Sequence, residues 1–265
     1  MVPIAQATTS INDLNTAGKK VDMMRKQEHT NTPKHIAIIP DGNRRCAKRL
    51  LKRPWKGHEW GMSKVKTLFN WSKELGIKTI TFYALSLENL EKRPGREVKY
   101  LFGLAAKEID DIIENRDNFV HKDRIRVTFF GNTDRLPEGL QEKIDKAMDI
   151  TRRYSKYAIN FAIAYGGRQE ITEACRRIAL GVEAGSITPA SVNEMMIKHN
   201  LQTNGYGDPD LIVRTGGEKR LSNFLLFQSA YSELAFVDTL WPDLTKKEFN
   251  RVITDYMHRD RRFGK

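Results

Sequence analysis

Arginines spaced by glycines are the side chains of this sequence with the clearest chemical potential. Arg214 and Arg220 are six residues apart, with Gly216-Gly217 between them and Ser222 shortly after. Guanidinium groups bind phosphate oxygens in a fork-like geometry, and glycine lets the backbone approach an anion closely. Isolated arginines would more often be surface charges or partners of Glu. The grouping here instead predicts a site for a diphosphate.

A second anion site is predicted roughly 170 residues earlier in the chain. The apolar run His35 to Ile39 ends in Asp41-Gly42, which Asn43-Arg44-Arg45 follows. The free amides and positive dipole end of a helix start favour a phosphate. An Asp before Gly is usually only a turn former. A carboxylate inside an anion site would, however, repel the phosphate unless a divalent cation lay between them. We therefore favour a metal-ligating or catalytic role for Asp41 and expect Mg²⁺.

Several other polar residues carry weaker signals. His58 follows a basic run, and a lone His is usually structural, but diphosphate binding or proton transfer is an equal alternative. The segment Ser86 to Asn89 follows an apolar strand. An Asn at such a place normally marks a turn, but the polar groups of this segment could also orient a phosphate oxygen. Arg93 adds a cation at the same edge. Glu233 lies in an apolar stretch, so we expect it to be buried and to need a partner or a metal.

One acidic segment resembles a metal-binding motif but is predicted not to bind a metal. Asp110-Asp111-Ile112-Ile113-Glu114 resembles a magnesium-binding motif of all-helical prenyl-chain synthases. Its isoleucines fall on the apolar stripe of an amphipathic helix, so the acids are predicted to form a solvated face. Phosphate-binding Walker loops, dinucleotide turns and zinc-protease motifs are not found in the sequence.

Composition narrows the class of protein. The 265 residues suit one large domain, and 45 Lys plus Arg against 33 Asp plus Glu give a net charge of +12. An anionic partner is expected, but the arginines lie in glycine-containing turns, which disfavours nucleic acid. The two cysteines have no metal-ligand spacing. No signal peptide or long apolar run is evident, so we expect a soluble cytoplasmic protein, with peripheral membrane contact left open.

The hydrophobic pattern predicts an α/β fold. Residues 1 to 33 are polar and are interpreted as a tail or a loosely docked helix, and 34 to 265 as one domain. Amphipathic helices are predicted from 61 to 75, 97 to 115, 137 to 154, 170 to 184 and 189 to 199, with a capping box at Thr245. Candidate strands are His35 to Ile39, Thr79 to Ala84, Arg126 to Phe130, Ile159 to Ala164, Leu211 to Val213 and a less marked one at Leu234 to Val237.

Alternation of strands and helices is typical of a mostly parallel central sheet flanked by helices. Ligands of such sheets bind beyond the carboxyl ends of the strands. Asp41, the segment 86 to 89 and the segment 214 to 222 all fall at such ends, so one binding region is expected.

Five separated motifs together resemble the cis-prenyltransferase family, the undecaprenyl and dehydrodolichyl diphosphate synthases. The resemblance runs in order over about residues 34 to 265, and the Arg44-Arg45 pair with Ser86-x-Glu88-Asn89 is more similar to archaeal or eukaryotic members. The motifs are His35 to Ala47 with Gly57-His58, Ser86 to Pro94, Tyr165 to Arg168, Leu211 to Gln228 and Trp241-Pro242-Asp243.

The resemblance implies the roles of particular residues. Asp41 would handle Mg²⁺ and the departing diphosphate, Asn89 would be a proton-handling group, and Glu233 would complete the metal site. The remaining positions would bind the two substrates or surround the reacting carbons: Gly42, Asn43, Arg44, Arg45, Cys46, His58, Ser86, Leu87, Glu88, Leu90, Arg93, Arg214, Arg220, Leu221 and Ser222.

The resemblance also implies an apolar tunnel for the growing chain and a homodimer. The stripe from Val98 to Ile113 is a candidate tunnel wall, with plain core packing as the alternative. Arg262-Phe263-Gly264 resembles an ending that family members contribute across the dimer interface, and a free basic tail is the alternative.

Several positions depart from the family pattern. Cys46 stands where an aromatic is usual, and Leu87 and Leu90 replace polar and aromatic residues. Lys219 replaces a frequent His, and Pro54 occupies the place of a diphosphate-binding Arg, for which Arg53 is a candidate substitute. We expect these changes to cluster around the allylic substrate and to alter the allylic preference, the product length or the acceptor.

The sequence thus predicts a Mg²⁺-dependent homodimeric enzyme. It would transfer a C10 to C20 allylic prenyl diphosphate to isopentenyl diphosphate, or to a related five-carbon acceptor, and form a cis-polyprenyl diphosphate. The alternatives are an atypical condensation with a different acceptor or a short product, and a non-catalytic subunit of a heteromeric synthase. Such subunits commonly lack the first Asp and its arginines, which this chain retains. A further rival, a binder of nucleic acid or anionic membrane, would depend on the +12 charge alone.

Overall fold

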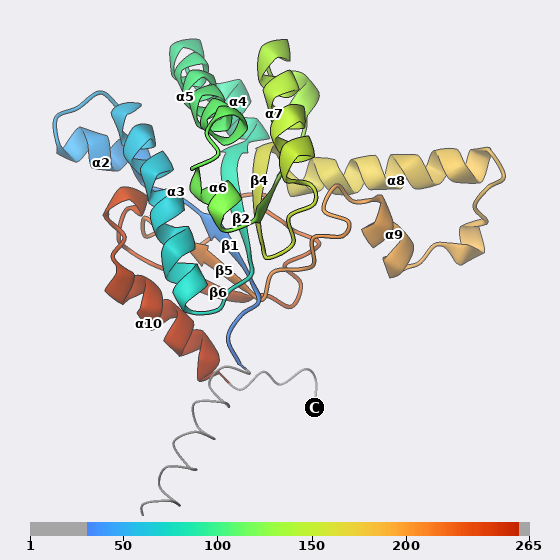
Figure 1. Cartoon of the computed structure of the whole chain (residues 1–265). Helices are drawn as coiled ribbons and strands as arrows, with labels where there is room; N and C mark the ends of the chain where they lie inside the picture. The colour runs from blue at the N-terminus through green and yellow to red at the C-terminus, as the bar shows by residue number, and fades with distance from the viewer. Residues whose placement is uncertain (1–30, 260–265) are drawn as a thin grey trace, which may run out of the picture.

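A six-stranded parallel sheet forms the centre of the computed structural model, which describes residues 31–259 (Figure 1). The strand order is β3-β4-β2-β1-β5-β6 and every neighbouring pair is parallel. The strands are β1 (His35–Ile39), β2 (Thr79–Ser86), β3 (Ile125–Phe130), β4 (Tyr157–Tyr165), β5 (Leu211–Arg214) and β6 (Glu233–Phe236).

Helices and short 3-10 turns connect the strands. The helices are α2 (Asn43–Arg49), α3 (Lys56–Glu74), α4 (Leu87–Lys92), α5 (Gly95–Glu114), α6 (Phe119–Lys122), α7 (Glu138–Thr151), α8 (Gly167–Glu183), α9 (Glu194–Asn200) and α10 (Lys246–Met257). The 3-10 turns are η1 (Thr133–Arg135), η2 (Pro189–Ser191) and η3 (Trp241–Asp243).

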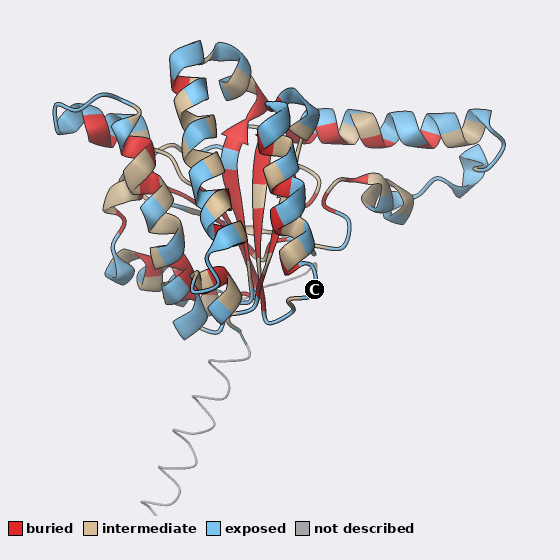
Figure 2. Cartoon of the chain, turned by 45° about the horizontal axis from the view of Figure 1, so that its top comes forward, coloured by how far each residue is buried: buried red, intermediate tan, exposed pale blue. Residues whose placement is uncertain are grey.

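The two faces of the sheet bury two apolar clusters. Successive strand residues point to opposite faces, so Ile36 and Ile38 join one cluster while Ala37 and Ile39 join the other. The first cluster packs under α3, α5, α7 and α10, and the second packs under the segment around Phe224 and Leu225. Figure 2 shows the strands as the most deeply buried part of the molecule.

The predicted fold class is confirmed, and all six predicted strands are present. The segment predicted as one helix from 189 to 199 is instead the turn η2 followed by α9, because the side chain of Asn193 caps a new helix by accepting from the amide of Met196. The short helix α4 was not predicted. Ser86 caps its first turn, since the Ser86 hydroxyl accepts from the backbone amide of Asn89.

Three further predictions concern the apolar tunnel, the helix near the start of the chain and the ending Arg262-Phe263-Gly264. The stripe on α5 packs against the core, with Ile109 and Ile112 buried and Leu101 and Phe102 beside them. The apolar tunnel therefore stays a prediction. The helix that the sequence suggests before residue 31 and the ending Arg262-Phe263-Gly264 lie outside the described residues. Between residues 31 and 259, no helix is both long and apolar enough to cross a membrane.

Candidate active site

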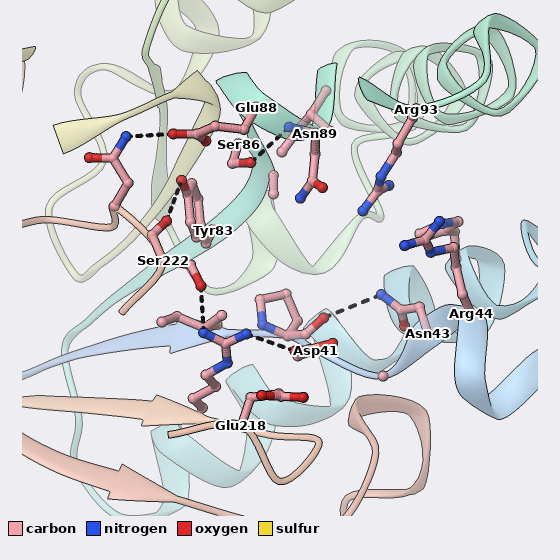
Figure 3. A pocket seen from close by; sticks show the side chains of 18 of the residues that line it. Asp41, Asn43, Arg44, Tyr83, Ser86, Glu88, Asn89, Arg93, Glu218 and Ser222 are labelled. Atoms are coloured by element: carbon pink, nitrogen blue, oxygen red, sulfur yellow. Dashed lines mark hydrogen bonds and ion pairs between the residues drawn. The ribbon is translucent and has the colours of Figure 1, made fainter. Parts of the chain in front are cut away.

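A pocket of about 730 Å³ opens at the carboxyl ends of β1, β2 and β5 (Figure 3). Asp41 and Gly42 follow β1, Ser86 closes β2, and Arg214 closes β5. Because β1 lies between β2 and β5 in the sheet, segments distant in sequence meet at one edge. The two predicted anion sites are therefore two sides of a single pocket.

The backbone after β1 is shaped by close packing. Gly42 has φ of 110°, and a side chain there would lie 2.8 Å from Leu240. Gly57 and Gly61 of α3 lie against Asn43, where an added Cβ would come within 1.9 Å of its carbonyl oxygen and 2.4 Å of its side-chain oxygen. These glycines let α3 press onto the first turn of α2. That contact holds Asn43 and the arginines after it at the pocket.

Asp41 lies between arginines from two segments. Its carboxylate accepts from Arg45 at 3.1 Å and from Arg214 at 2.9 Å. Burial by itself disfavours the ionised carboxylate, but the hydrogen bonds and charges of Arg214 and Arg45 outweigh it and lower the pKa of Asp41. Asp41 is therefore a carboxylate at neutral pH.

Arg214 is the most enclosed cation of the pocket, with only 6% of its side chain exposed. Its guanidinium also donates to the hydroxyl of Ser222 at 2.8 Å and to the carbonyl of Arg220. Its Nε is buried and has no hydrogen-bond partner among the described residues. A buried donor of this kind lacks an acceptor, and an anionic oxygen of a ligand would supply one.

The loop after β5 is folded tightly around this arginine. Gly216 and Gly217 have φ of 84° and 78°, and a side chain on Gly216 would lie 2.5 Å from Arg45. Ser222 and Asn223 also have positive φ, at 51° and 67°. Left-handed conformations are costly for residues other than glycine and cluster at functional sites. Arg220 lines the pocket beyond them and forms an ion pair with Glu218.

The other side of the pocket is organised by Glu97, which the sequence reasoning missed. This buried carboxylate lies 3.2 Å from Nε2 of His58, 3.4 Å from Arg93 and 3.9 Å from Arg44. Burial, followed by the charge of Arg93, lowers the pKa of His58, against the raising effect of Glu97. The Arg93 Nε is buried without a partner among the described residues. The signal available in the sequence was an acid four residues after Arg93.

Asn223 joins the loop after β5 to α4 and α8 and was not among the predicted site residues. Its amide donates to Glu88 at 2.7 Å and to Gln169 at 3.0 Å, and its side-chain oxygen accepts from the amide of Arg168 at 2.8 Å. Tyr83 supports the same loop, because its hydroxyl lies 3.2 Å from the carbonyl oxygen of Ser222. Figure 3 shows Asn89 beside this group, with its amide directed into the pocket.

The structure brings most of the predicted site residues together. The predicted residues that line the pocket are Asp41, Gly42, Asn43, Arg44, Arg45, His58, Ser86, Glu88, Asn89, Arg93, Arg214, Arg220 and Ser222. Cys46, Leu87, Leu90 and Leu221 do not line it. Cys46 is buried beside Asp243, and Leu87 is buried. Leu90 is half-buried against the first apolar cluster, and Leu221 packs against the second.

Glu233 is not near Asp41. It pairs in register with Leu211, at the amino end of β5, whereas Asp41 follows the carboxyl end of β1. It is also not buried: 31% of its side chain is exposed, and it forms an ion pair with Arg259. The expected burial is wrong because β6 lies at the sheet edge. The parallel register also places Glu233 and Asp41, the two predicted metal ligands, at opposite ends of the sheet within one chain.

The departures from the family pattern also lie elsewhere than expected. Cys46, Leu87 and Leu90 face the interior, and Pro54 and Lys219 are exposed, so none of the five lines the pocket. The expected cluster around the allylic substrate is not formed by these side chains.

Comparison with known proteins identifies the relatives of this chain. Residues 39–264 match the family described as "Putative undecaprenyl diphosphate synthase". The chain belongs to the cis-prenyltransferase family. A Thermococcus kodakarensis protein is 45% identical over 92% of this chain and 91% of its own length, and a Methanocaldococcus jannaschii protein is 43% identical over 89% and 84%. Both are named tritrans,polycis-undecaprenyl-diphosphate synthase (geranylgeranyl-diphosphate specific).

Solved structures agree with this membership. A lavandulyl diphosphate synthase from Lavandula x intermedia, in complex with dimethylallyl diphosphate, is 35% identical with a TM-score of 0.83. A probable undecaprenyl diphosphate synthase from Campylobacter jejuni is 34% identical with a TM-score of 0.72. Each similarity covers 89% of this chain and 100% of the other. The cis-prenyltransferase described here is therefore a prenyl-transferring enzyme with its family's α/β fold.

Proposed function

We propose that this enzyme extends geranylgeranyl diphosphate with isopentenyl diphosphate units to a polyprenyl diphosphate of undecaprenyl length. The observation that carries the proposal is the single pocket with cations on two sides and Asp41 between them. Two diphosphates need two such cationic sites, because each anion must be held without repelling the other. The names of the archaeal relatives support the choice of a C20 primer and this chain length.

The allylic diphosphate is assigned to the side formed by α2, His58 and Arg93. Arg44 and Arg93 reach this side with Glu97 fixing their positions, and Asn43 begins α2. In the reaction, the bond between the allylic C1 and its oxygen breaks, and the diphosphate leaves with the bonding electrons. Cations already in place around that group stabilise its growing negative charge.

Isopentenyl diphosphate is assigned to Arg214, Arg220 and Ser222. Its double bond supplies the electrons for the new carbon–carbon bond, and one proton then leaves its C2 to form the new cis double bond. Asn89 and Ser86 lie above the space between the two cation groups (Figure 3). We assign Asn89 to the positioning of the reacting carbons and to hydrogen bonding during the loss of that proton.

Mg²⁺ fits this pocket as a partner of Asp41 and of substrate oxygens. Residues 31–259 contain no group of three or more His, Cys, Asp or Glu able to hold a metal by themselves. Mg²⁺ commonly uses one or two carboxylates together with phosphate oxygens, and Asp41 is an ionised carboxylate at the junction of both sites. When bound, the ion would neutralise charge on the departing diphosphate. A homodimer also remains part of the proposal.

Product analysis with purified protein tests the proposal. Labelled isopentenyl diphosphate is incubated with C10, C15 or C20 allylic diphosphates, with Mg²⁺ or with excess chelator, and products are separated by chain length. The expected result is Mg²⁺-dependent growth, most efficient from the C20 primer, to an undecaprenyl-length product. No growth by the purified chain would contradict the proposal and favour a non-catalytic subunit.

An atypical condensation that gives a short product is the second candidate function. It is supported by the structural similarity to the lavandulyl diphosphate synthase in complex with dimethylallyl diphosphate. Adding dimethylallyl diphosphate as a primer to the same assay separates the two candidates. Accumulation of a C10 product, with no chain growth from C20, would favour the second.

A further inference from the structure

The loop between α2 and α3 exposes apolar side chains to an unusual degree. Leu51 is 95% exposed and Leu50 is 50% exposed. Leu51 also has a φ of 55°, a left-handed conformation that is costly for any residue with a Cβ atom. Figure 2 shows this loop as an exposed arc at one side of the molecule, beyond α2. The described residues leave half of Leu50 and nearly all of Leu51 exposed, so both leucines are available to a partner.

The same loop and the helix ends that border it carry an excess of unpaired positive charge. The cations between residues 48 and 56 are Lys48, Arg49, Lys52, Arg53 and Lys56. Two of them form ion pairs within the chain, since Arg49 pairs with Asp243 and Lys56 pairs with Glu59. Lys48, Lys52 and Arg53 form no ion pair with another residue of the described chain. Apolar tips surrounded by free cations distinguish this loop from an ordinary polar turn.

An adjoining surface extends the feature. Trp55 at the end of the loop lies 6.2 Å from the ring of Tyr100 on α5, and Arg53 lies over the Trp55 ring at 5.6 Å. A surface groove of about 770 Å³ continues between α3 and α5, and the charged residues that line it are Arg96, Lys99 and Lys107 with Glu59 and Glu108. The loop and groove together form one basic, partly aromatic surface, which we call the loop–groove surface.

We propose that the loop–groove surface docks the protein on an anionic lipid bilayer, with Leu50 and Leu51 inserted among the acyl chains. The charge of the surface complements acidic lipid headgroups, and the leucines match the apolar layer beneath them. Trp55 is the residue type that favours the headgroup level. A second copy of this chain would bring the same positive charge against it. Nucleic acid would leave the two leucines in water.

Docking there would have a consequence for the reaction. Asn43 at the start of α2 lines the pocket, and Leu50 directly follows its end. A helix of seven residues is about 10 Å long, so the loop lies close to the site. Given the proposed function, whose product is a long lipid, this surface would hold the pocket near the membrane that receives the product.

Vesicle binding tests the proposal without any substrate, so its failure would leave the proposed reaction untouched. The full chain is sedimented with vesicles of phosphatidylcholine alone or with about one third phosphatidylglycerol. We expect binding to the anionic vesicles only, and a loss of roughly tenfold in partitioning for Leu50→Ser/Leu51→Ser and for Lys48→Glu/Lys52→Glu. Leu180→Ser, at another exposed leucine, is the matched control and should bind as the parent does.

A site-specific probe separates insertion from simple charge attraction. Cys175 is exposed and Cys46 is buried, so Leu51→Cys in a Cys175→Ser background carries one accessible thiol for an environment-sensitive fluorophore. We expect a blue shift on adding anionic vesicles, and none for the same label at Leu180→Cys. Equal shifts at both positions, unchanged binding by the double variants, or oligomerisation that depends on Leu50 and Leu51 would overturn the proposal.

Discussion

Nη2 of Arg214 lies 2.9 Å from Oδ2 of Asp41, although 173 residues separate them in the chain. Arg214 belongs to the proposed isopentenyl diphosphate side, and Asp41 also pairs with Arg45 of the allylic side. One carboxylate therefore contacts cations from both anion sites. The Nε of Arg214 has no partner among the described residues, so this arginine can keep its contact with Asp41 and still donate to a diphosphate oxygen.

Asp41→Ala is expected to lower kcat roughly 100- to 1,000-fold, because it removes the one carboxylate shared by both sites. It also leaves the enclosed Arg214 without its ionic partner, which costs roughly 1–3 kcal/mol of folding stability. Initial rates with labelled isopentenyl diphosphate and thermal unfolding measure the two effects. Glu218→Gln, which removes an acid from the pocket wall, is the control. A rate loss no greater than that of the control would refute the role of Asp41.

Glu97→Gln tests the buried carboxylate that gathers Arg44, His58 and Arg93. The amide keeps the side-chain size but loses the charge, so the KM for the allylic diphosphate should rise roughly tenfold, with a smaller change for isopentenyl diphosphate. Because Glu97 raises the pKa of His58 against burial, its neutralisation should lower that pKa further, as NMR titration can measure. Glu91→Gln, at an exposed pair with Arg135, is the control. An unchanged His58 titration would contradict the assignment.

Asn223→Gly should reduce kcat/KM roughly 10- to 100-fold by releasing the Ser222 loop from Glu88 and from α8. Glycine accepts the φ of 67°, so the variant removes the side chain without adding backbone strain. Asn223→Ala adds that strain and should also lower the melting temperature. Gln169→Ala, which removes a single one of these hydrogen bonds, is the matched control. A wild-type rate in Asn223→Gly would show that the connection is not needed.

Acid stability is expected to depend on His35. Its ring contacts the Thr81 hydroxyl at 2.7 Å and the Gly207 carbonyl at 3.1 Å, and burial lowers its pKa from 6.5 to about 4. Because the folded pKa is below the unfolded value, this contribution is complete above pH 6.5 and is lost as the pH falls towards 4. The loss amounts to roughly 3 kcal/mol.

Denaturant unfolding between pH 7 and pH 4 measures this effect. His35→Gln should be less stable at neutral pH but should lose less stability on acidification than the parent protein. His199→Gln, at an exposed position on α9, is the control. Parallel pH profiles for His35→Gln and the parent would rule out His35 as the source.

Local patterns in the sequence were sufficient for much of the fold. The apolar runs predicted all six strands, and the Thr245 capping box marks the start of α10 as expected. These features depend on residues within a few positions of one another. Asn193 marks the limit of such reasoning, because its cap interrupts a helical pattern that the apolar spacing alone would continue.

The candidate site was predicted less completely. Residues next to strand ends, such as Asp41 and Arg214, were found because parallel strands carry ligands at that edge. Glu97 was missed because its burial results from the packing of α3, which carries His58, against α5. The burial of Glu233 was predicted wrongly because only the pairing of β6 with β5 decides that this residue lies on an edge strand.

The sequence by itself determined the sheet, the residue types of two anion sites and the family, since these follow from local patterns of side chains. Only the tertiary structure decided that both sites share Asp41, that one buried carboxylate organises three cations, and that the described residues leave Leu50 and Leu51 largely exposed. The physical reason is that these relationships join segments distant in the chain, and strand register and helix packing set the distances between them.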